Sequence, residues 1–114
     1  MRDRARLIIA LCALALGVAH AGLGLALYPT FSLDLLWFVG AGLAMMSVAM
    51  SNVLARRESL RDKLVLIAQN AMMVSYFAAA WVLLAAPQVA LGGLLFGALL
   101  LIRLAELRAQ EPLT

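Results

Sequence analysis

His20 is the residue of this chain whose type and position most suggest chemistry. It is the only histidine, and it lies inside a long apolar run, where an ionisable side chain predicts a functional role. An imidazole nitrogen can ligate haem iron or another metal ion, or hydrogen-bond a quinone. A neutral histidine is equally satisfied by one donor and one acceptor contact within the protein. His20 is therefore a candidate cofactor-binding residue, and a plain hydrogen-bonded role is the alternative.

Other chemistries lack the residues that they need. The single cysteine, Cys12, excludes an intrachain disulfide and a cysteine cluster for zinc or iron–sulfur. A lone histidine excludes paired-histidine haem ligation within one chain. The serines of the apolar runs have no carboxylate–histidine pair nearby, and no glycine-rich phosphate loop is present. We therefore predict no catalytic residue, no metal and no cofactor, and we disfavour an enzyme.

The composition predicts a membrane protein. The chain has 114 residues, of which 66% are hydrophobic and 13% are charged, whereas a soluble domain is about half apolar and one quarter charged. A soluble fold of this size could not bury so much apolar surface, so the excess must face the lipid bilayer. The net charge of +3 would otherwise suggest nucleic acid. Because the charges lie only at the ends of apolar runs, we expect no nucleic-acid partner.

Four apolar stretches are long enough, or nearly so, to cross a bilayer, which takes roughly 20 residues. They cover residues 7–28, 35–55, 64–86 and 89–107. The last run is short before Arg103, whose head group we expect to snorkel to the interface. Pro29 ends the first span, and Ser59 with Asp62 predicts a capping box before the third. The prediction is an all-α protein: one domain over 1–114, an antiparallel bundle of four transmembrane helices.

The basic residues predict the orientation of this bundle. With four spans, all nine fall on one side, and the connections on the other side hold only Asp34. Because cytoplasmic segments are rich in arginine and lysine, we expect both termini in the cytoplasm of a bacterial cell and the chain in its inner membrane. The nine are Arg2, Arg4, Arg6, Arg56, Arg57, Arg61, Lys63, Arg103 and Arg108.

Residues 1–21 also have the features of a secretory signal. A basic start and an apolar core lead to Ala19-His20-Ala21, which matches a signal-peptidase site. The apolar run continues to Leu27, however, and is long enough to span. We expect the segment to stay as the first helix; cleavage would remove His20 from the mature protein.

Small residues recur at four-residue spacing in every span, which places them on one face of a helix. Such faces let helix backbones approach closely in lipid, so we expect them to pack within the bundle. The alternative for one of them, most plausibly Gly93 and Gly97, is an interface between copies of the chain. The set is Ala13, Gly17 and Ala21; Gly40 and Ala44; Ala71, Ser75 and Ala79; and Gly93 and Gly97.

A polar band lies near the cytoplasmic ends of the second and third spans. It consists of Ser51, Asn52, Gln69 and Asn70. Amide groups in lipid must find partners, so hydrogen bonds between the two helices are expected. The functional alternative is a polar pocket open to the cytoplasm.

Aromatic residues gather near the outer ends of the spans. Tyr28, Phe31, Trp37 and Phe38 flank the first connection, and Trp81 lies near the end of the third span. This pattern is typical of an aromatic belt at the membrane interface, which needs no ligand.

Two segments carry a resemblance to known families. Gly17-Val18-Ala19-His20-Ala21-Gly22-Leu23-Gly24 and Leu36-Trp37-Phe38-Val39-Gly40-Ala41-Gly42-Leu43 resemble small four-helix bacterial inner-membrane proteins, broadly DoxX-like in layout. That resemblance implies the four-helix fold but no settled activity. Size and helix count also resemble those of the small multidrug-resistance transporters. The first span lacks their membrane-embedded glutamate, so drug–proton exchange is not implied.

Three functions are compatible with these features. The first is an accessory or interaction subunit, with a larger membrane-protein partner or a second copy of the chain. The second is a small oligomeric transporter or channel for a small solute, using the amide band or His20. The third and least favoured is a redox or lipid-modifying enzyme with His20 in its site.

Overall fold

The computed structural model describes residues 2–110 and places four α-helices in that range. They are α1 (Arg2–Leu27), α2 (Leu33–Leu54), α3 (Leu60–Leu83) and α4 (Pro87–Arg108). Each is long and apolar enough to cross a membrane. The prediction of an all-helical chain with four such helices is confirmed.

The helix boundaries follow from local signals in the sequence. The Ser32 hydroxyl caps α2 by accepting a hydrogen bond from the Leu35 N–H at 3.2 Å. Ser59 and Asp62 form the expected capping box of α3, in which the Asp62 carboxylate accepts from the Ser59 N–H at 2.9 Å. Pro87 is the first residue of α4, where a missing N–H costs nothing.

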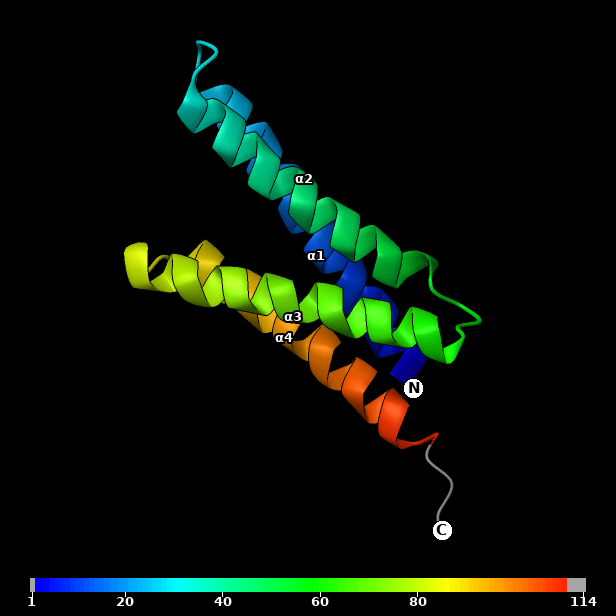
Figure 1. Cartoon of the computed structure of the whole chain (residues 1–114). Coiled ribbons are helices and arrows are strands. Elements are labelled where there is room, and N and C mark those ends of the chain that lie inside the picture. Colours follow the sequence, from blue (N-terminus) through cyan, green and yellow to red (C-terminus); the bar gives the residue numbers. More distant parts are fainter. Residues whose placement is uncertain (1, 111–114) are drawn as a thin grey trace.

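The helices form two hairpins that meet at one end and separate at the other (Figure 1). α1 runs beside α2, and α3 runs beside α4; between the hairpins, α1 contacts α4, while α2 and α3 touch little. The chain start, the 55–59 connection and the end of α4 lie where the hairpins meet, which we call the basic end. The 28–32 and 84–86 connections lie at the opposite end, which we call the splayed end.

Close backbone contact joins α1 to α2. A Cβ atom added to Gly42 would lie 2.9 Å from the Gly17 carbonyl oxygen and 2.9 Å from the Ala21 nitrogen. Ala13, one turn from Gly17, is also fully buried. The small-residue face predicted on the first helix therefore packs against the second, as expected when helices associate without a hydrophobic driving force between them.

The partner face on α2 differs from the predicted one. Gly42 makes the contact, whereas Gly40 has no neighbouring atom within 4 Å of an added Cβ and Ala44 is exposed. A shift of two residues turns a helix by about 200°, so Gly40 and Ala44 point away from α1. Both glycines are present in the sequence, and the four-residue spacing of small residues wrongly predicts Gly40 as the contact instead of Gly42.

The small residues of the second hairpin also lie mostly off its core. Ser75 and Ala79 are exposed and Ala71 is half-buried. On α4 the tight position is Gly92, where a Cβ would overlap the Phe77 ring. Gly93 only touches Phe77, and Gly97 has open space beside it. Large aromatic side chains, rather than small-residue faces, thus join α3 to α4.

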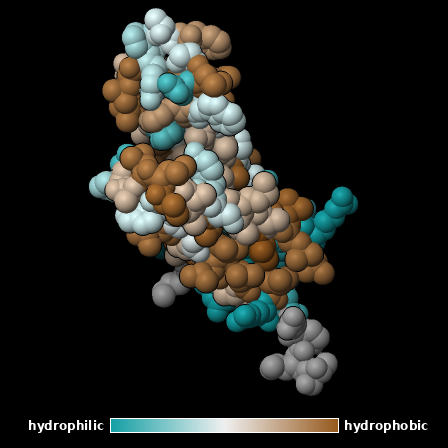
Figure 2. Space-filling model, turned by 60° about the vertical axis from the view of Figure 1, so that its left-hand side comes forward, coloured by the Kyte–Doolittle hydropathy of each residue, from teal (hydrophilic) through white to brown (hydrophobic). Residues whose placement is uncertain are grey.

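Apolar side chains dominate the outer surface. Figure 2 shows a broad hydrophobic region across the middle of the molecule and hydrophilic residues gathered at its lower end. Leu25, Leu54, Val82 and Leu94 are among the large apolar side chains left exposed. A surface of this kind is suited to lipid contact.

We expect Gly42→Leu to destabilise the α1–α2 hairpin and Gly40→Leu to be tolerated. The first adds a side chain against backbone atoms of α1, which costs about 1–3 kcal/mol for overpacking. The second adds the same atoms to open space on the same helix, so helix propensity changes equally in both. Unfolding by dodecyl sulfate in mixed micelles, followed by circular dichroism, compares the two; equal stability of the variants would contradict the α1–α2 contact.

Candidate functional site

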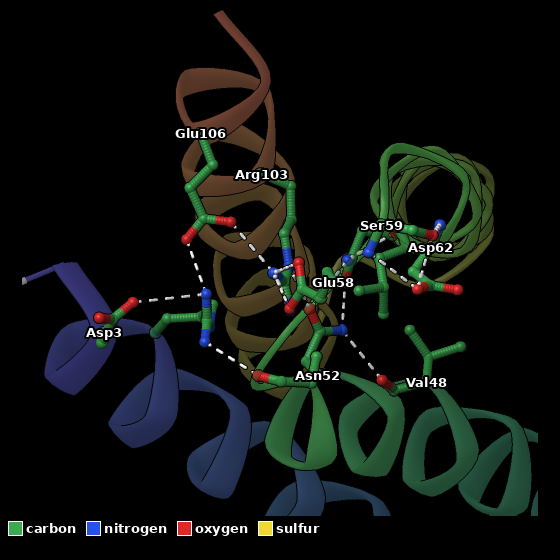
Figure 3. A network of polar contacts seen from close by, with 12 residues as sticks. Asp3, Val48, Asn52, Glu58, Ser59, Asp62, Arg103 and Glu106 are labelled. Atoms are coloured by element: carbon green, nitrogen blue, oxygen red, sulfur yellow. Dashed lines mark hydrogen bonds and ion pairs between the residues drawn. The ribbon is translucent and has the colours of Figure 1, made fainter. Parts of the chain in front are cut away.

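Arg103 lies at the centre of the polar contacts at the basic end. Its side chain is fully buried, whereas the sequence predicts a head group that snorkels to the membrane interface. The Nη1 atom donates to both Glu58 carboxylate oxygens, at 2.7 and 2.8 Å. Figure 3 shows the guanidinium reaching from α4 to Glu58 and to Asn52. Arg103 is held by protein anions instead of by water.

A chain of ion pairs extends from Arg103 across the bundle. Arg103 Nη1 also contacts the Glu106 Oε2 atom at 3.0 Å, and Glu106 Oε1 accepts from Arg6 Nη1 at 2.8 Å. Arg6 Nη2 donates to the Ala55 carbonyl at 3.0 Å. Two cations and two anions therefore alternate along the chain and balance each other, and the exposed Asp3 carboxylate lies 3.5 Å from Arg6 at its end. We refer to Arg6, Glu58, Arg103 and Glu106 as the ion cluster.

An amide pair joins the ion cluster to α2 and α3. Asn52 and Asn70 exchange hydrogen bonds, at 3.1 and 3.2 Å, and both side chains are almost fully buried. The Asn52 Oδ1 atom also accepts from Arg103 Nε at 3.2 Å. Two residues of the predicted polar band therefore meet as expected, and through Arg103 they become part of one network that touches all four helices.

The other two residues of the predicted band lie outside this network. The Ser51 hydroxyl donates to the Ser47 carbonyl of its own helix at 3.0 Å. The buried Gln69 Oε1 atom has no hydrogen-bond partner among residues 2–110. Both side chains instead line a groove between α2 and α3 at the basic end.

The positions of these side chains follow from local structure. Arg103 and Glu106 are three residues apart on α4, so they share a face. Glu58 precedes the α3 capping box, which fixes the path of the connection. Arg6 lies one turn into α1 and reaches α4 because the hairpins meet at this end. The result is a buried network in which one donor, Arg103 Nη2, has no partner among the described residues.

A second site occupies the splayed end, between the two hairpins. It is a cleft of about 610 Å³ to which all four helices contribute, a size within the range of small-molecule sites. Its polar lining residues are His20, Tyr28, Asp34, Tyr76 and Gln88. Trp37 and Phe38, which the sequence assigned to an aromatic belt, also line it. We call this site the splayed cleft.

His20 lies in the splayed cleft with its ring flat against Phe38. The ring centroids are 4.0 Å apart and the ring planes differ by 5°. Phe38 therefore covers one face of the imidazole. Within residues 2–110, no group of three or more His, Cys, Asp and Glu side chains is arranged to hold a metal ion. The site offers stacking surface and hydrogen-bonding groups to a small molecule.

Sequence reasoning missed the ion cluster as a unit. In the sequence, Arg6 and Arg103 indicate only topology, and no local pattern singles out Glu58 and Glu106, although the side chains of these two glutamates are only 6% and 14% exposed. The available signal was the short apolar run before Arg103, which places a cation close to the apolar part of the helix. A cation there needs an anion from another segment, and only the fold identifies which one.

Comparisons with protein-family models, with curated proteins and with solved structures find no match for this chain. The resemblance to DoxX-like membrane proteins therefore stays a prediction.

We expect Arg103→Gln to destabilise the protein by about 3–5 kcal/mol, because it leaves the buried Glu58 carboxylate without its cation and Glu106 with Arg6 alone. Arg108→Gln is the matched control: it removes the same charge from the same helix at an exposed position. Free energies of unfolding in mixed micelles measure the difference. If the two variants lose the same stability, the ion cluster is not what holds this end together.

Asn52 is expected to matter more than Asn70. Asn52→Leu leaves Asn70 Oδ1 without a donor and Arg103 Nε without an acceptor, at about 1–3 kcal/mol for each stranded group. Asn70→Leu leaves Asn52 bonded to the Val48 carbonyl and to Arg103 Nε. The double variant should lose less free energy of unfolding than the sum of the losses in the two single variants. Ser51→Ala, which removes a bond within one helix, serves as the control. Strict additivity would show that the two amides do not interact.

Proposed function

We propose that this chain is a small multi-pass protein of the bacterial inner membrane, with both termini in the cytoplasm, that transports a small solute through the splayed cleft. The solute we favour is a partly aromatic organic cation. The observation that carries this proposal is the cleft itself: a hollow at one end of the molecule whose lining reaches the core residues Met45 and Phe77.

The charge distribution supports the orientation. All nine basic residues belong to the segments of the basic end, and such segments stay in the cytoplasm. The splayed cleft then opens toward the outer face of the membrane. A solute arriving from that face would reach His20 and Phe38 without crossing the basic end.

The lining of the cleft supports a cationic solute. Among the described residues that line it, Asp34 is the only one with a charge, and the aromatic rings come from Tyr28, Trp37, Phe38, Tyr76 and Phe77. The faces of aromatic rings attract cations, and a carboxylate at the rim adds to that attraction. His20 and Gln88 can accept or donate hydrogen bonds to polar groups of the solute.

The closed basic end favours a transporter over a channel. The ion cluster and the amide pair fill the space where a continuous pore would leave toward the cytoplasm. Release on that side requires the hairpins to separate there, and a neutral network of alternating charges can re-form after each opening. Transporters alternate between a state that is open only to one side of the membrane and a state that is open only to the other.

An accessory subunit is the second candidate function. It is favoured by the small-residue positions that face outward, Gly40 and Ala44 on α2 and Ser75 and Ala79 on α3. Helices of a partner could pack closely against these faces. In that case a larger membrane protein should co-purify at fixed stoichiometry.

Binding of the cation tetraphenylphosphonium tests the cleft, and tetraphenylborate, an anion of similar size and shape, is the comparison ligand. Trp37 lines the cleft and is one of two tryptophans, so Trp81→Phe protein reports on it by fluorescence. We expect a saturable change with the cation and little with the anion. Asp34→Asn should weaken binding about tenfold, equivalent to roughly 1.4 kcal/mol.

Asp3→Asn is the control for cation binding in the cleft, because it removes an exposed carboxylate at the opposite end of α1, whose one ion pair among residues 2–110 is a 3.5 Å contact with Arg6. It should leave cation binding unchanged. Uptake of the same cation into liposomes that contain only this protein then tests transport. Equal binding of cation and anion would contradict the proposed solute, and binding without uptake would leave the accessory role as the better account.

A further inference from the structure

The groove between α2 and α3 at the basic end combines a basic rim with apolar walls. It has a volume of about 430 Å³, and the 55–59 connection closes one side of it. Arg56, Arg57 and Arg61 line its rim. All three are exposed, in contrast to the buried cations of the ion cluster.

The carboxylates near this groove are already engaged. Both Glu58 oxygens accept from Arg103, and Asp62 accepts from the Ser59 hydroxyl at 2.7 Å and from the Ser59 N–H. Among residues 2–110, none of the three rim arginines forms an ion pair within 4.0 Å. The groove lining therefore holds three unpaired arginines and one carboxylate, Asp62, that no arginine of this range pairs within 4.0 Å, so its charge is positive on balance and complementary to an anion. Guanidinium groups bind phosphate oxygens in pairs.

The walls beside the arginines are suited to hydrocarbon. Leu54 and Val65 line the groove and are 72% and 51% exposed, so apolar surface continues from the rim along the outside of the helices. Because α2 and α3 contact each other little, this surface is not covered by the chain itself. Ser51 and Gln69 lie about one helical turn further from the rim than Leu54 and Val65, and they add hydrogen-bonding groups to the groove lining.

We propose that the α2–α3 groove binds an anionic phospholipid, with its phosphate at Arg56, Arg57 and Arg61 and its acyl chains along Leu54 and Val65. A free phosphate would satisfy the arginines but leave the apolar walls bare, so the lipid is the occupant that uses both. Basic pockets between membrane helices on the cytoplasmic side recognise such headgroups. The site depends on the membrane insertion proposed above, but it is separate from the splayed cleft and from its solute.

The same arginines also contribute to orientation, so the test must separate binding from topology. Arg56→Lys, Arg57→Lys and Arg61→Lys together keep every positive charge of the segment and remove only the guanidinium groups. The corresponding glutamine variant removes the charge as well. A control with Arg2, Arg4 and Arg108 changed to Gln removes equal charge from exposed positions outside the groove.

The full chain, recovered from the membrane fraction and purified in a nonionic detergent, is titrated with phosphatidylglycerol. Phosphatidylcholine with the same acyl chains and inorganic phosphate are the comparison ligands. Native mass spectrometry counts bound lipid, and the thermal unfolding midpoint gives an independent readout. We expect phosphatidylglycerol to bind and to raise the midpoint, while neither comparison ligand does so at the same concentration.

The variants give the decisive comparison. The glutamine variant should bind phosphatidylglycerol at least about tenfold more weakly than the native chain, the lysine variant should show an intermediate loss, and the control should bind like the native chain. If the triple glutamine variant does not fold, Arg61→Gln against Arg4→Gln makes the same comparison. Equal losses in groove and control variants, or equal binding of phosphatidylcholine, would overturn the proposal. Stabilisation by inorganic phosphate alone would show a soluble-anion site and overturn the lipid assignment.

Discussion

The structure depends on the burial of one guanidinium group. Arg103 is fully enclosed at the basic end, and an enclosed cation is tolerated only when anions and hydrogen-bond acceptors surround it. Glu58, Glu106 and Asn52 meet that requirement, and each comes from a different part of the chain or a different turn of α4. Satisfying Arg103 therefore brings the two hairpins together at this end. It also explains why the connection between α2 and α3 follows a defined path inward at Glu58.

The splayed cleft follows from the joining of the two hairpins at the basic end only. Helices that are joined strongly at one end by polar contacts, and that pack within each hairpin through Gly42 or Phe77, have little to hold them together at the other end. Apolar side chains do not drive helix association when the surrounding solvent is also apolar. The hairpins can therefore separate where polar contacts are absent. The proposed transport needs such an arrangement, because opening one end and closing the other requires contacts that can break and re-form.

Charge is distributed along the molecule in a way that separates three roles. Paired charges inside the basic end form the ion cluster and contribute to stability. In our proposals, the unpaired arginines on its surface orient the chain and hold an anionic lipid. At the splayed end a single carboxylate, Asp34, stands among aromatic rings. Where arginine is buried, at Arg6 and Arg103, it contributes to packing. Where it is exposed, at Arg56, Arg57 and Arg61, it contributes to the proposed recognition of lipid.

Patterns in the sequence predict the four apolar helices, the proline and serine residues at their boundaries, and the small-residue face of α1 around Gly17. These features depend on local periodicity, capping and composition, which are visible within a few turns of chain. The sequence also predicts the Asn52–Asn70 pair, because a short connection brings the two residues to the same depth. Tertiary structure alone decided that Gly42 and not Gly40 contacts α1, that Arg103 is buried against Glu58, and that Trp37 and Phe38 line a cleft. Each of these depends on how one helix is rotated toward another, which four-residue spacing leaves open and which only the summed contacts of both hairpins determine.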